Sequence, residues 1–350
     1  MIDQGGTIGI LGGGQLGRML AMAAAALGYR CHVFTPERDS VAGEVSHQTT
    51  CSPWTDDQAI RAFADDCDVI TLEFENVPVA PLGPLAAKLF PGVRALEIAQ
   101  DRLNEKRFVT ELGGKPAPFH PVESQTDLAE AIERIGVPGI LKTRRDGYDG
   151  KGQWRIRSAR DAEAIRLPSA PTVYEGFVEF EAEFSVILAR GHDGAIRYWD
   201  SSQNVHEGGI LARSSLPAAP IIVDQVEEAR ELAAKVASAL DYVGVLTLEF
   251  FATSAGPIFN EMAPRVHNSG HWTIEGAATS QFANHIRAIC GLPLGITSLV
   301  ARELAMDNVI GPDIERALER LRESDTHVHI YGKKQAVEGR KMGHVTRLVR

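Results

Sequence analysis

ILKTRRDGYDGKGQ, residues 140–153, is the stretch around which we interpret the rest of the chain. An apolar run ends at Lys142, and the alternation around Trp154 and Ile156 marks a returning strand. The tip between the two strands contains three glycines and three further basic side chains. Backbone N–H groups and cations of this kind bind phosphate oxygens, although solvated glycine-rich hairpin tips are also common. The stretch therefore predicts a β-hairpin with a basic, flexible tip.

The composition is typical of a soluble globular protein with more than one domain. The chain has 350 residues, of which 44% are hydrophobic and 23% are charged. A net charge of −10 argues against a non-specific nucleic-acid binder. The four cysteines are scattered without a CxxC pair, as in a reduced cytosolic protein. The start lacks a basic leader, and the apolar patch Met19–Leu27 is too short to span a bilayer. We therefore expect a cytoplasmic protein that binds neither membranes nor nucleic acid.

The N-terminal region predicts a βαβ unit. A strand at Thr7–Leu11 is followed by GGGQLG, a helix at Gln15–Leu27 and a strand at Arg30–Phe34. The G-x-G-x-x-G pattern is typical of a nicotinamide-dinucleotide site, with Glu37 at a suitable distance for a ribose. We favour the alternative interpretation, a Rossmann-like scaffold whose loop binds another phosphate or only packs tightly, because this fold hosts many functions.

Acidic residues follow the next predicted strand, Val69–Leu72, in the sequence EFENVP (73–78). Carboxylates at the end of a parallel strand lie in the ligand crevice of such sheets. The alternative is a helix N-cap and a solvated turn. Residues 90–95 are predicted to form the last strand of this domain.

A helix is predicted at residues 99–112. Its charged residues Asp101, Arg102 and Lys106 would normally form a solvated face.

The apolar strand Thr172–Val178 loses its pattern at Glu175. An acid followed by free backbone groups in an apolar wall suits an adenine ring, but the signal is weak by itself. Glu183 lies among the residues of a following strand, 181–188. Residues 204–211 are predicted to be a polar, glycine-rich loop.

The strongest local chemistry lies in a second hairpin. A strand ending at Phe251 is predicted to return at residues 258–262, so that Glu249 and Glu261 face each other and Asn260 adds an amide oxygen. Buried carboxylates are costly unless they are paired or bound to a cation. Two glutamates suit Mg²⁺, completed by water and phosphate oxygens, whereas a pair of salt bridges is the alternative. The stretch APRVHNSGHW, 263–272, is rich in groups that bind small anions and must lie beside this site.

Together these motifs resemble the ATP-grasp superfamily and, within it, the family of N5-carboxyaminoimidazole ribonucleotide synthetases. The matching motifs are GGGQLGRML (12–20), KTRRDGYDGKGQ (142–153), NVH (204–206), NEMAPRVHNSGHW (260–272) and GRKMGH (339–344). The last two are specific to the family, whereas the two-glutamate hairpin marks only the superfamily. The resemblance implies a mixed α/β and α+β fold. Its parts would be a Rossmann-like N-terminal domain (1–98), an ATP-grasp domain (99–290) and a small C-terminal domain (291–350).

The resemblance also implies which residues bind each ligand. ATP would be held by Arg102, Lys142, Gly147, Tyr148, Asp149, Gly150, Lys151, Gly152, Gln153, Glu175, Gly176, Phe177, Val178, Glu183, His206, Asn260 and Glu261. Mg²⁺ would be held by Glu249 and Glu261. The ribonucleotide would be held by Gln15, Leu16, Glu75, Asn76, Asn268, Lys333, Arg340 and Lys341, the last three at its phosphate. The catalytic residues would be Arg265 and His267 at the bicarbonate, Asn268, and Tyr148 and Asp149, which would close over the site.

The implied reaction joins 5-aminoimidazole ribonucleotide and bicarbonate at the expense of ATP, giving the N5-carboxylated product, ADP and phosphate. Bicarbonate is a poor electrophile, and its phosphorylation to carboxyphosphate would deliver CO₂ beside the amine. Catalysis would then depend mainly on positioning and electrostatics. The glycine-rich hairpin would act as a lid that excludes water. The resemblance further implies a homodimer, the common symmetric state.

Three other functions remain open at this point. A formate-dependent glycinamide ribonucleotide transformylase would share the phosphate and metal residues, but RVHNSGHW favours the bicarbonate enzyme. An NAD-dependent oxidoreductase built on Gly12–Gly17 would leave the paired glutamates and the basic hairpin unexplained. A non-catalytic nucleotide sensor would not need Lys142, Glu249 and Glu261 together.

Overall fold

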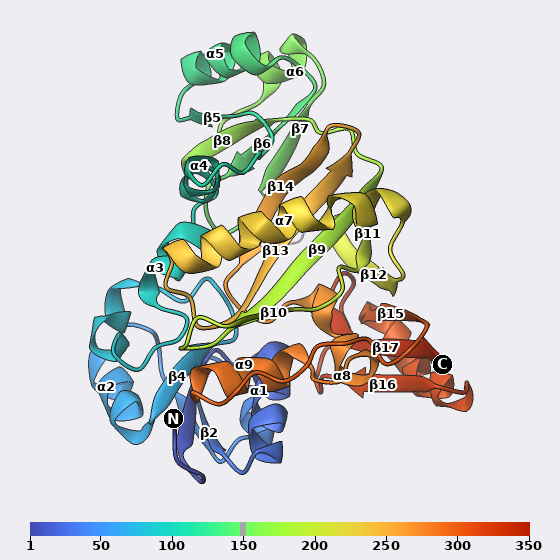
Figure 1. The fold of residues 1–350 in the computed structure, drawn as a ribbon. Helices are drawn as coiled ribbons and strands as arrows, with labels where there is room; N and C mark the ends of the chain where they lie inside the picture. Colours follow the sequence, from blue (N-terminus) through green and yellow to red (C-terminus); the bar gives the residue numbers. More distant parts are fainter. Residues whose placement is uncertain (148–151) are drawn as a thin grey trace.

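The structure is a computed structural model that describes residues 1–147 and 152–350. The described residues form three β-sheets, one above another in Figure 1. A parallel sheet near the N-terminus lies at the bottom, a large antiparallel sheet lies in the middle, and a small antiparallel sheet lies at the top. The α/β and α+β character expected from the sequence is confirmed.

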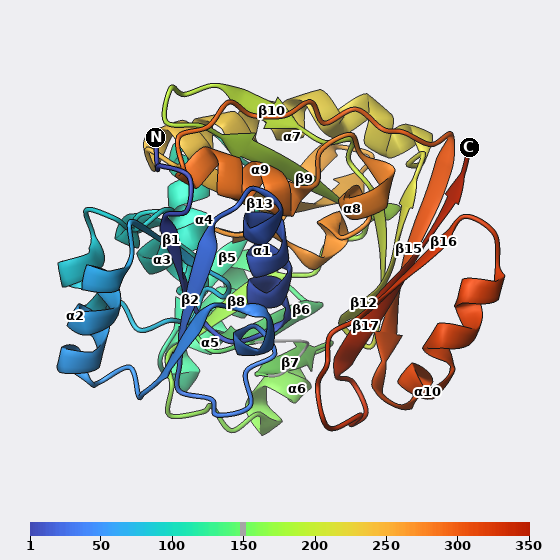
Figure 2. The same ribbon diagram turned by 90° about the horizontal axis from the view of Figure 1, so that it is seen from below.

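The N-terminal sheet is parallel, with the strand order β3-β2-β1-β4. Its strands are β1 (Thr7–Leu11), β2 (Arg30–Thr35), β3 (Gln48–Cys51) and β4 (Val69–Leu72). Helices α1 (Gln15–Ala26) and α2 (Asp57–Asp66) lie on opposite sides of it (Figure 2). The predicted strands β1, β2 and β4 and the helix after the glycine-rich loop are confirmed. Because the strands run the same way, the residues after β1 and β4 meet at one edge.

The strand predicted at residues 90–95 is wrong. Leu89 forms an isolated parallel bridge with Ile70, after which the chain leaves the sheet. Pro91 has no N–H group to donate to a ladder. Helix α3 (Val93–Ala99) forms instead.

The helix predicted at residues 99–112 is interrupted at its start. Asp101 caps a separate helix, α4 (Arg102–Glu111), and its carboxylate accepts hydrogen bonds from the backbone N–H groups of Leu103 and Asn104 at 3.0 and 3.4 Å. An aspartate at this position satisfies N–H groups that the first turn leaves unpaired. The chain therefore changes direction at Asp101.

The small upper sheet is antiparallel, with the order β5-β8-β6-β7. Its strands are β5 (Phe119–Val122), β6 (Gly139–Thr143), β7 (Gln153–Ile156) and β8 (Thr172–Gly176), and α5 (Gln125–Ile135) and α6 (Ala159–Ala164) cover its outer side in Figure 1. The hairpin predicted from residues 140–153 is confirmed, with Lys142 opposite Gln153. Its tip, residues 148–151, lies outside the described residues.

The large sheet has the order β14-β13-β9-β11-β12-β15-β17-β16, and β10 pairs with β9. Its central strands are β9 (Ala182–Arg190), β10 (Ile196–Tyr198), β11 (Gln203–Glu207), β12 (Ile210–Leu216), β13 (Gly244–Thr253) and β14 (Gly256–Ala263). The long helix α7 (Pro220–Ala239) crosses one face of β9 and β13 (Figure 1). Phe184, Leu246 and Phe250 are among the residues that form the core beneath it.

The glycine-rich loop predicted at residues 204–211 is a β-hairpin, formed by β11 and β12. Gly208 and Gly209 form its two-residue turn with φ values of 60° and 85°. Two positive φ angles in succession are the requirement of the tight turn that suits the twist of antiparallel strands. The glycines therefore mark a strand connection and not an extended loop.

The C-terminal strands extend the same large sheet. They are β15 (Glu303–Ile310), β16 (Thr326–Ile330) and β17 (Lys341–Val349). The remaining helices are α8 (Thr273–Gly276), α9 (Gln281–Ile289) and α10 (Ile314–Ala317), with 3-10 turns at Gly43–Val45, Ala80–Leu85, Asn268–Gly270, Gly311–Asp313 and Leu318–Arg322. Helix α9 lies between α1 and the large sheet (Figures 1 and 2).

His285 on α9 joins the N-terminal sheet to the large sheet. The Val245 N–H donates to Nδ1 at 3.0 Å, so the neutral ring carries its proton on Nε2, which lies 2.7 Å from Thr71 Oγ1. Burial lowers the pKa of His285 to about 3, which keeps the ring neutral. Thr71 precedes the acidic end of β4, and Val245 lies on the strand that carries Glu249. The imidazole therefore helps to set the positions of these two strand ends relative to each other.

We expect His285→Leu to lower the free energy of unfolding by roughly 2–4 kcal/mol, because a buried N–H and a buried hydroxyl both lose a partner. Urea denaturation measures the change. The exposed His47 offers the control His47→Leu, which should stay within about 0.5 kcal/mol of wild type. Equal midpoints for the two variants would show that the imidazole does not join the sheets.

Candidate active site

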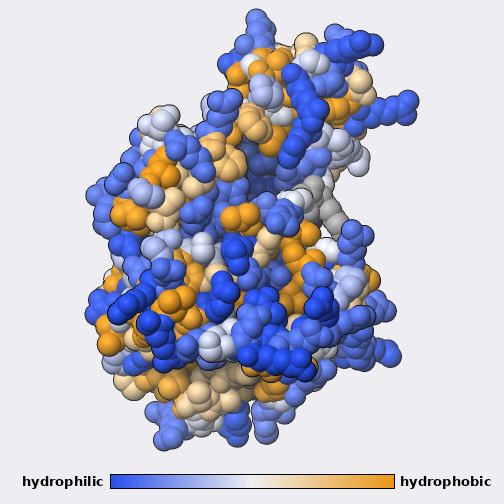
Figure 3. Space-filling model, turned by 90° about the vertical axis from the view of Figure 1, so that its right-hand side faces the viewer, coloured by the Kyte–Doolittle hydropathy of each residue, from blue (hydrophilic) through white to orange (hydrophobic). Residues whose placement is uncertain are grey.

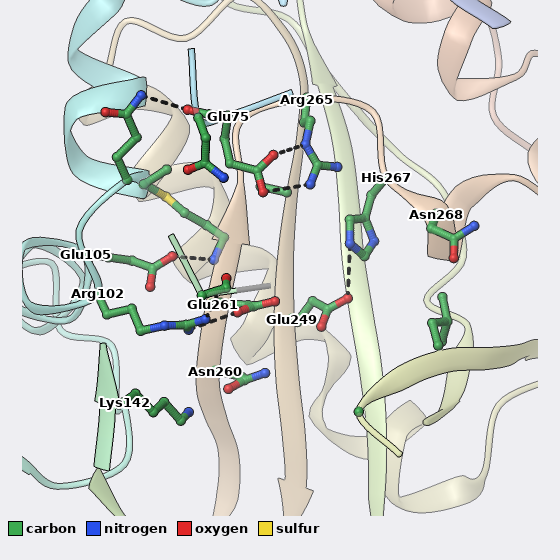
Figure 4. A pocket seen from close by; sticks show the side chains of 18 of the residues that line it. Glu75, Arg102, Glu105, Lys142, Glu249, Asn260, Glu261, Arg265, His267 and Asn268 are labelled. Carbon is green, nitrogen blue, oxygen red and sulfur yellow. Dashed lines mark hydrogen bonds and ion pairs between the residues drawn. The ribbon is translucent and has the colours of Figure 1, made fainter. Parts of the chain in front are cut away.

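A cavity of about 350 Å³ lies between the three sheets, and residues from each of them line it. Seen from the side, the surface is hollowed beneath the small upper sheet (Figure 3). Charged side chains dominate the lining in Figure 4, with glutamates, arginines, a lysine and a histidine pointing toward one another. The way in which these charges are paired determines what the cavity can bind.

Two glutamates approach the cavity from adjacent strands. Glu249 on β13 and Glu261 on β14 are direct cross-strand partners, which confirms the predicted pairing. Burial, and then the negative charge of Glu261, raise the pKa of Glu249 to about 7. Burial also opposes ionisation of Glu261, but Arg102 and Lys142 outweigh it and lower the pKa of this carboxyl. One member of the pair is thus ionised more readily than the other.

The glutamate pair fits a hard divalent cation. Glu249 Oε1 is buried and accepts no hydrogen bond within the described residues, although His267 Nε2 lies 3.4 Å from it. A buried carboxylate without compensation is costly, and carboxylate oxygens are preferred ligands of Mg²⁺. In the part of the chain that the structure describes, no group of three or more His, Cys, Asp or Glu side chains is arranged to hold a metal. The fitting arrangement is therefore two carboxylates completed by water and ligand oxygens.

A buried glutamate binds two lysines below the small sheet. Glu175 Oε2 lies 2.9 Å from Lys142 Nζ and 3.3 Å from Lys106 Nζ. Burial opposes the charge of Glu175, but the two lysines outweigh it and lower the pKa of the carboxyl to about 2. The prediction that Lys106 lies on a solvated face is wrong: α4 packs against β14, and Lys106 is 1% exposed.

The backbone after Glu175 is less free than predicted. The Gly176 N–H donates to the carbonyl oxygen of Pro118 at 2.8 Å. The Phe177 N–H donates to the carbonyl oxygen of Pro138 at 3.1 Å. Neither N–H group is therefore available to an adenine ring.

Asp101 joins helix α4 to the basic hairpin. Arg144 donates to its two carboxylate oxygens at 3.0 and 2.7 Å, and Arg145 adds a contact at 3.4 Å. The next residue, Arg102, reaches the other way and places Nη1 3.1 Å from Glu261 Oε2. The prediction of a solvated charged face is thus wrong for Asp101 and Arg102 as well, because both form ion pairs across elements. The base of the hairpin is connected through the start of α4 to the glutamate pair.

Glu183 and His206 form a third charged pair. The His206 Nδ1 contacts the Glu183 carboxylate. Burial lowers the pKa of His206, but the hydrogen bond that its ring donates to Glu183 and the negative charge of Glu249 outweigh it, so the net shift is upward. The neighbouring carboxylates therefore favour the protonated form of His206.

Arg265, just after β14, is held by Glu75 at the end of β4. Its Nε contacts Oε2, and its Nη2 donates to Oε1 at 2.9 Å, as the paired dashed lines in Figure 4 show. Burial opposes the charge of Glu75, but Arg265 outweighs it and lowers the pKa of the carboxyl. Such a two-point contact sets the plane of the guanidinium. It also joins the N-terminal sheet to the large sheet at the cavity.

The glycine-rich loop before α1 packs on a carboxylate. The Gly14 N–H donates to Glu73 Oε1 at 2.8 Å, and the Gly17 N–H donates to Oε2 at 3.3 Å. A Cβ atom would lie 2.4 Å from Glu73 if placed on Gly12 and 2.8 Å if placed on Gly14. These N–H groups are the ones that would hold a dinucleotide pyrophosphate. The contacts favour the scaffold interpretation of the loop over the dinucleotide site.

His267 is held as a neutral ring beside Glu249. The Ser269 N–H donates to Nδ1 at 3.3 Å, so Nε2 carries the proton and lies 3.4 Å from Glu249 Oε1. Burial, and then the positive charge of Arg265, lower the pKa of His267 well below its ordinary value. Gln281 holds the backbone of His267 by accepting from its N–H at 2.9 Å and donating to its carbonyl at 2.7 Å.

Basic residues approach the other end of the cavity from the C-terminal strands. Lys341, at the start of β17, lines the cavity, and Lys333 donates to its carbonyl oxygen at 2.8 Å. Burial, and then the positive charge of Arg340, lower the pKa of Lys333 to about 8. Like charges gathered in this way favour an anionic ligand.

The structure brings most of the predicted site residues together. Those that line the cavity are Gln15, Leu16, Glu75, Asn76, Arg102, Lys142, Gly147, Gln153, Glu183, His206, Glu249, Asn260, Glu261, Arg265, His267, Asn268 and Lys341. Those placed outside its lining are Gly152, Glu175, Gly176, Phe177, Val178, Lys333 and Arg340. Tyr148, Asp149, Gly150 and Lys151 lie outside the described residues. The role of each residue toward a ligand stays a prediction.

Sequence reasoning missed Gln100, Glu105, Arg144 and Arg145, which also line the cavity. The two arginines lie in the basic hairpin stretch, so their position was a usable signal. Glu105 gave no signal, because its burial results from packing of α4 on β14. Its Oε1 accepts a hydrogen bond from the Met262 N–H at 2.6 Å, and burial raises its pKa to about 8.

Three family models match successive parts of the chain. The ribonucleotide synthetase preATP-grasp domain matches residues 6–100, and the ATP-grasp domain matches residues 107–282. The phosphoribosylaminoimidazole carboxylase C-terminal domain matches residues 305–350. The order of the three models follows the order of parts that the resemblance implied.

Full-length relatives are similar to this chain in sequence and in structure. The N5-carboxyaminoimidazole ribonucleotide synthase of Brucella melitensis is 50% identical, over 99% of this chain and 97% of its own. The structure of an N5-carboxyaminoimidazole ribonucleotide synthetase solved with ADP is 40% identical, with a TM-score of 0.94 over 99% of this chain and 93% of its own. An Aspergillus clavatus N5-carboxyaminoimidazole synthase, solved with ADP and 5-aminoimidazole ribonucleotide, is 31% identical. Its TM-score is 0.90 over 99% of this chain and 94% of its own.

We expect Glu105→Gln to weaken the pH dependence of stability. The protonated form of Glu105 is favoured in the folded state. The contribution of Glu105 to the free energy of unfolding is therefore fully present below pH 4.5, the ordinary pKa of a glutamate. It is lost as the pH rises through about 8, the pKa of Glu105 in the folded protein. Between pH 6 and 9 the wild type should lose on the order of 2 kcal/mol more free energy of unfolding than this variant.

Urea denaturation at both pH values measures the difference. The exposed Glu111 offers the control Glu111→Gln, which should follow the wild type. If Glu105→Gln also follows the wild type, the raised pKa of Glu105 is contradicted.

Proposed function

Because the chain belongs to the family of N5-carboxyaminoimidazole ribonucleotide synthases, we propose that its central cavity holds Mg-ATP, bicarbonate and 5-aminoimidazole ribonucleotide side by side. The protein is an ATP-dependent ligase of purine biosynthesis that makes N5-carboxyaminoimidazole ribonucleotide. The observation that carries the placement of ATP is the meeting of Lys142 and Arg102 with Glu249 and Glu261 across one cavity. Paired carboxylates and nearby cations are the set of groups that phosphoryl transfer requires.

ATP would lie between the small upper sheet and the large sheet. Lys142 and Arg102 would contact its phosphates, together with the backbone of the hairpin from Gly147 to Gln153. Glu183 and His206 would lie on the large-sheet side, where they form a pair. Residues 175–178 would lie at the adenine, and the satisfied N–H groups of Gly176 and Phe177 limit the contacts available there.

Glu249 and Glu261 would hold Mg²⁺, and the buried oxygen of Glu249 without a hydrogen-bond partner in the described residues supports this assignment. When bound, Mg²⁺ would neutralise charge that develops on the phosphate oxygens. The oxygen of Asn260, on the same strand, faces the same cavity and would contact the nucleotide. Tyr148 and Asp149, outside the described residues, would close over the site as the resemblance implies.

Bicarbonate would lie beside Arg265 and His267. The guanidinium is oriented by Glu75, and the neutral imidazole presents Nε2–H toward Glu249. Both donors are therefore set before the anion arrives, which is the arrangement that stabilises developing charge most effectively. Phosphorylation of bicarbonate would give carboxyphosphate. The amine of the ribonucleotide would then take up its carboxyl group, directly or as released CO₂, and inorganic phosphate would leave.

The ribonucleotide would lie between the N-terminal sheet and the C-terminal strands. Gln15, Leu16, Glu75, Asn76 and Asn268 line this end of the cavity. Asn268 is fixed by a reciprocal amide pair with Asn308, at 2.9 and 2.7 Å. The cations Lys333, Arg340 and Lys341 would bind the phosphate.

The wider organisation follows the same resemblance. We propose domains at residues 1–98, 99–290 and 291–350, a homodimer, and a place in the cytoplasm. Within the described residues, no helix is long and apolar enough to cross a membrane.

Purified protein with Mg-ATP should release ADP when 5-aminoimidazole ribonucleotide and bicarbonate are added, and not when formate and glycinamide ribonucleotide are added. Glu261→Gln should lower kcat by ~100-fold or more, since charge that develops on the phosphate loses its compensation. The exposed Glu228 offers the matched control Glu228→Gln, which should leave turnover unchanged. ADP release with formate and glycinamide ribonucleotide would mean that the proposed substrates are wrong. No ADP release with either pair of substrates would overturn the proposed ligase activity.

Lys333→Met should raise the KM for the ribonucleotide by roughly 10–100-fold, because a charged contact to its phosphate is lost. The KM for ATP should stay within about threefold, since the two ligands occupy different ends of the cavity. Steady-state kinetics with each substrate varied in turn measures both constants. The neighbouring Lys334→Met is the control, because the Lys334 side chain is exposed and pairs with Asp39. A change in the KM for ATP alone would contradict the proposed phosphate site.

A further inference from the structure

Lys106 shares one carboxylate oxygen with Lys142. Both ammonium groups contact Oε2 of Glu175, Lys142 at 2.9 Å and Lys106 at 3.3 Å. The other oxygen, Oε1, is buried and has no hydrogen-bond partner among the described residues. The carboxylate is therefore divided between two cations that come from different elements, β6 and α4.

The two lysines differ in their access to the cavity. Lys142 lines it, whereas Lys106 is not among its lining residues and is 1% exposed. The second contact of Lys106 is with the backbone oxygen of Asn260, at 3.4 Å. Lys106 thus lies behind the cavity wall and touches Glu175 and Asn260 from the rear.

Because two lysines share one carboxylate, one positive charge stays uncompensated. With Lys106 present, one carboxylate faces two ammonium groups. The three side chains together then keep a net charge of plus one beside the cavity. Without Lys106, Glu175 would form an exclusive pair with Lys142 and compensate its charge. In a buried site an uncompensated charge attracts an anion far more strongly than it does in water.

We propose that Lys106 is a positioning residue that neutralises Glu175 and so keeps the charge of Lys142 available to the phosphates of the nucleotide. Lys106 itself does not touch the ligand. This inference rests on the proposed placement of ATP beside Lys142. It assigns a binding function to a side chain that the sequence pattern placed on a solvated helix face.

The test is a double-mutant cycle on nucleotide affinity, with ADP and Mg²⁺ as the ligand and isothermal titration calorimetry of the full-length protein as the measurement. Lys106→Met should weaken ADP binding by roughly 10–100-fold. The same substitution made together with Glu175→Gln should change affinity by less than about threefold relative to Glu175→Gln alone. In that background no carboxylate remains to compensate Lys142.

Two results would overturn the inference. An equal loss of affinity in both backgrounds would mean that Lys106 acts on the ligand directly. An unchanged affinity for Lys106→Met would mean that its role is only structural. Circular dichroism verifies folding of each variant, and Lys106→Gln provides the same comparison if Lys106→Met does not fold.

Two further variants separate this inference from the proposed site. Lys142→Met should abolish measurable ADP binding, and normal binding by it would overturn the nucleotide placement itself. Loss of binding in Lys142→Met together with an equal effect of Lys106→Met in both backgrounds would overturn the inference alone. The exposed pair Lys115 and Glu228, 2.9 Å apart, is the matched control: Lys115→Met should leave affinity unchanged with or without Glu228→Gln.

Discussion

The cross-strand pairing of Glu249 with Glu261 is the constraint on which the rest of the site depends. Two carboxylates buried on one hairpin repel each other and lose hydration, so the surrounding fold must compensate them. The compensating groups come from separate elements: Arg102 begins α4, Lys142 ends β6, and His206 lies on β11. The charges around the glutamate pair therefore come from the small sheet, from the start of α4 and from a second hairpin of the large sheet itself.

The alternation of apolar and polar residues and the turn residues predicted the elements whose structure depends on neighbours in the sequence. The hairpin that delivers Lys142 and the hairpin that pairs the two glutamates are set by short turns and by alternation, both visible in the sequence. The strand predicted at 90–95 and the loop predicted at 204–211 were wrong for local reasons as well. Pro91 cannot donate to a ladder, and adjacent glycines at a turn are as typical of a tight hairpin as of a loop.

Contacts between residues far apart in the sequence could not be predicted from sequence patterns. Asp101 and Lys106 resemble a solvated helix face, because nothing near them in sequence shows that Glu175 and the basic hairpin will cover them. Likewise, G-x-G-x-x-G shows that something approaches the backbone closely, but not what. Here the group that approaches the backbone is Glu73, 59 residues from Gly14. Its carboxylate accepts hydrogen bonds from the N–H groups that a pyrophosphate would need. The motif thus predicted the fold of its turn correctly and left its partner open.

Burying charged side chains around this cavity costs free energy, but the same buried contacts fix the orientation of the groups that face it. Glu75 holds Arg265 in one plane, Ser269 and Gln281 hold His267, and Glu175 divides its charge between two lysines. Each contact removes freedom that binding would otherwise have to remove. The remaining imbalance is specific: Glu249 Oε1 accepts no hydrogen bond among the described residues, and two lysines share the single carboxylate of Glu175. A magnesium nucleotide carries both signs of charge, so it would correct both imbalances at once, whereas a lone anion or a lone cation would correct only one of them.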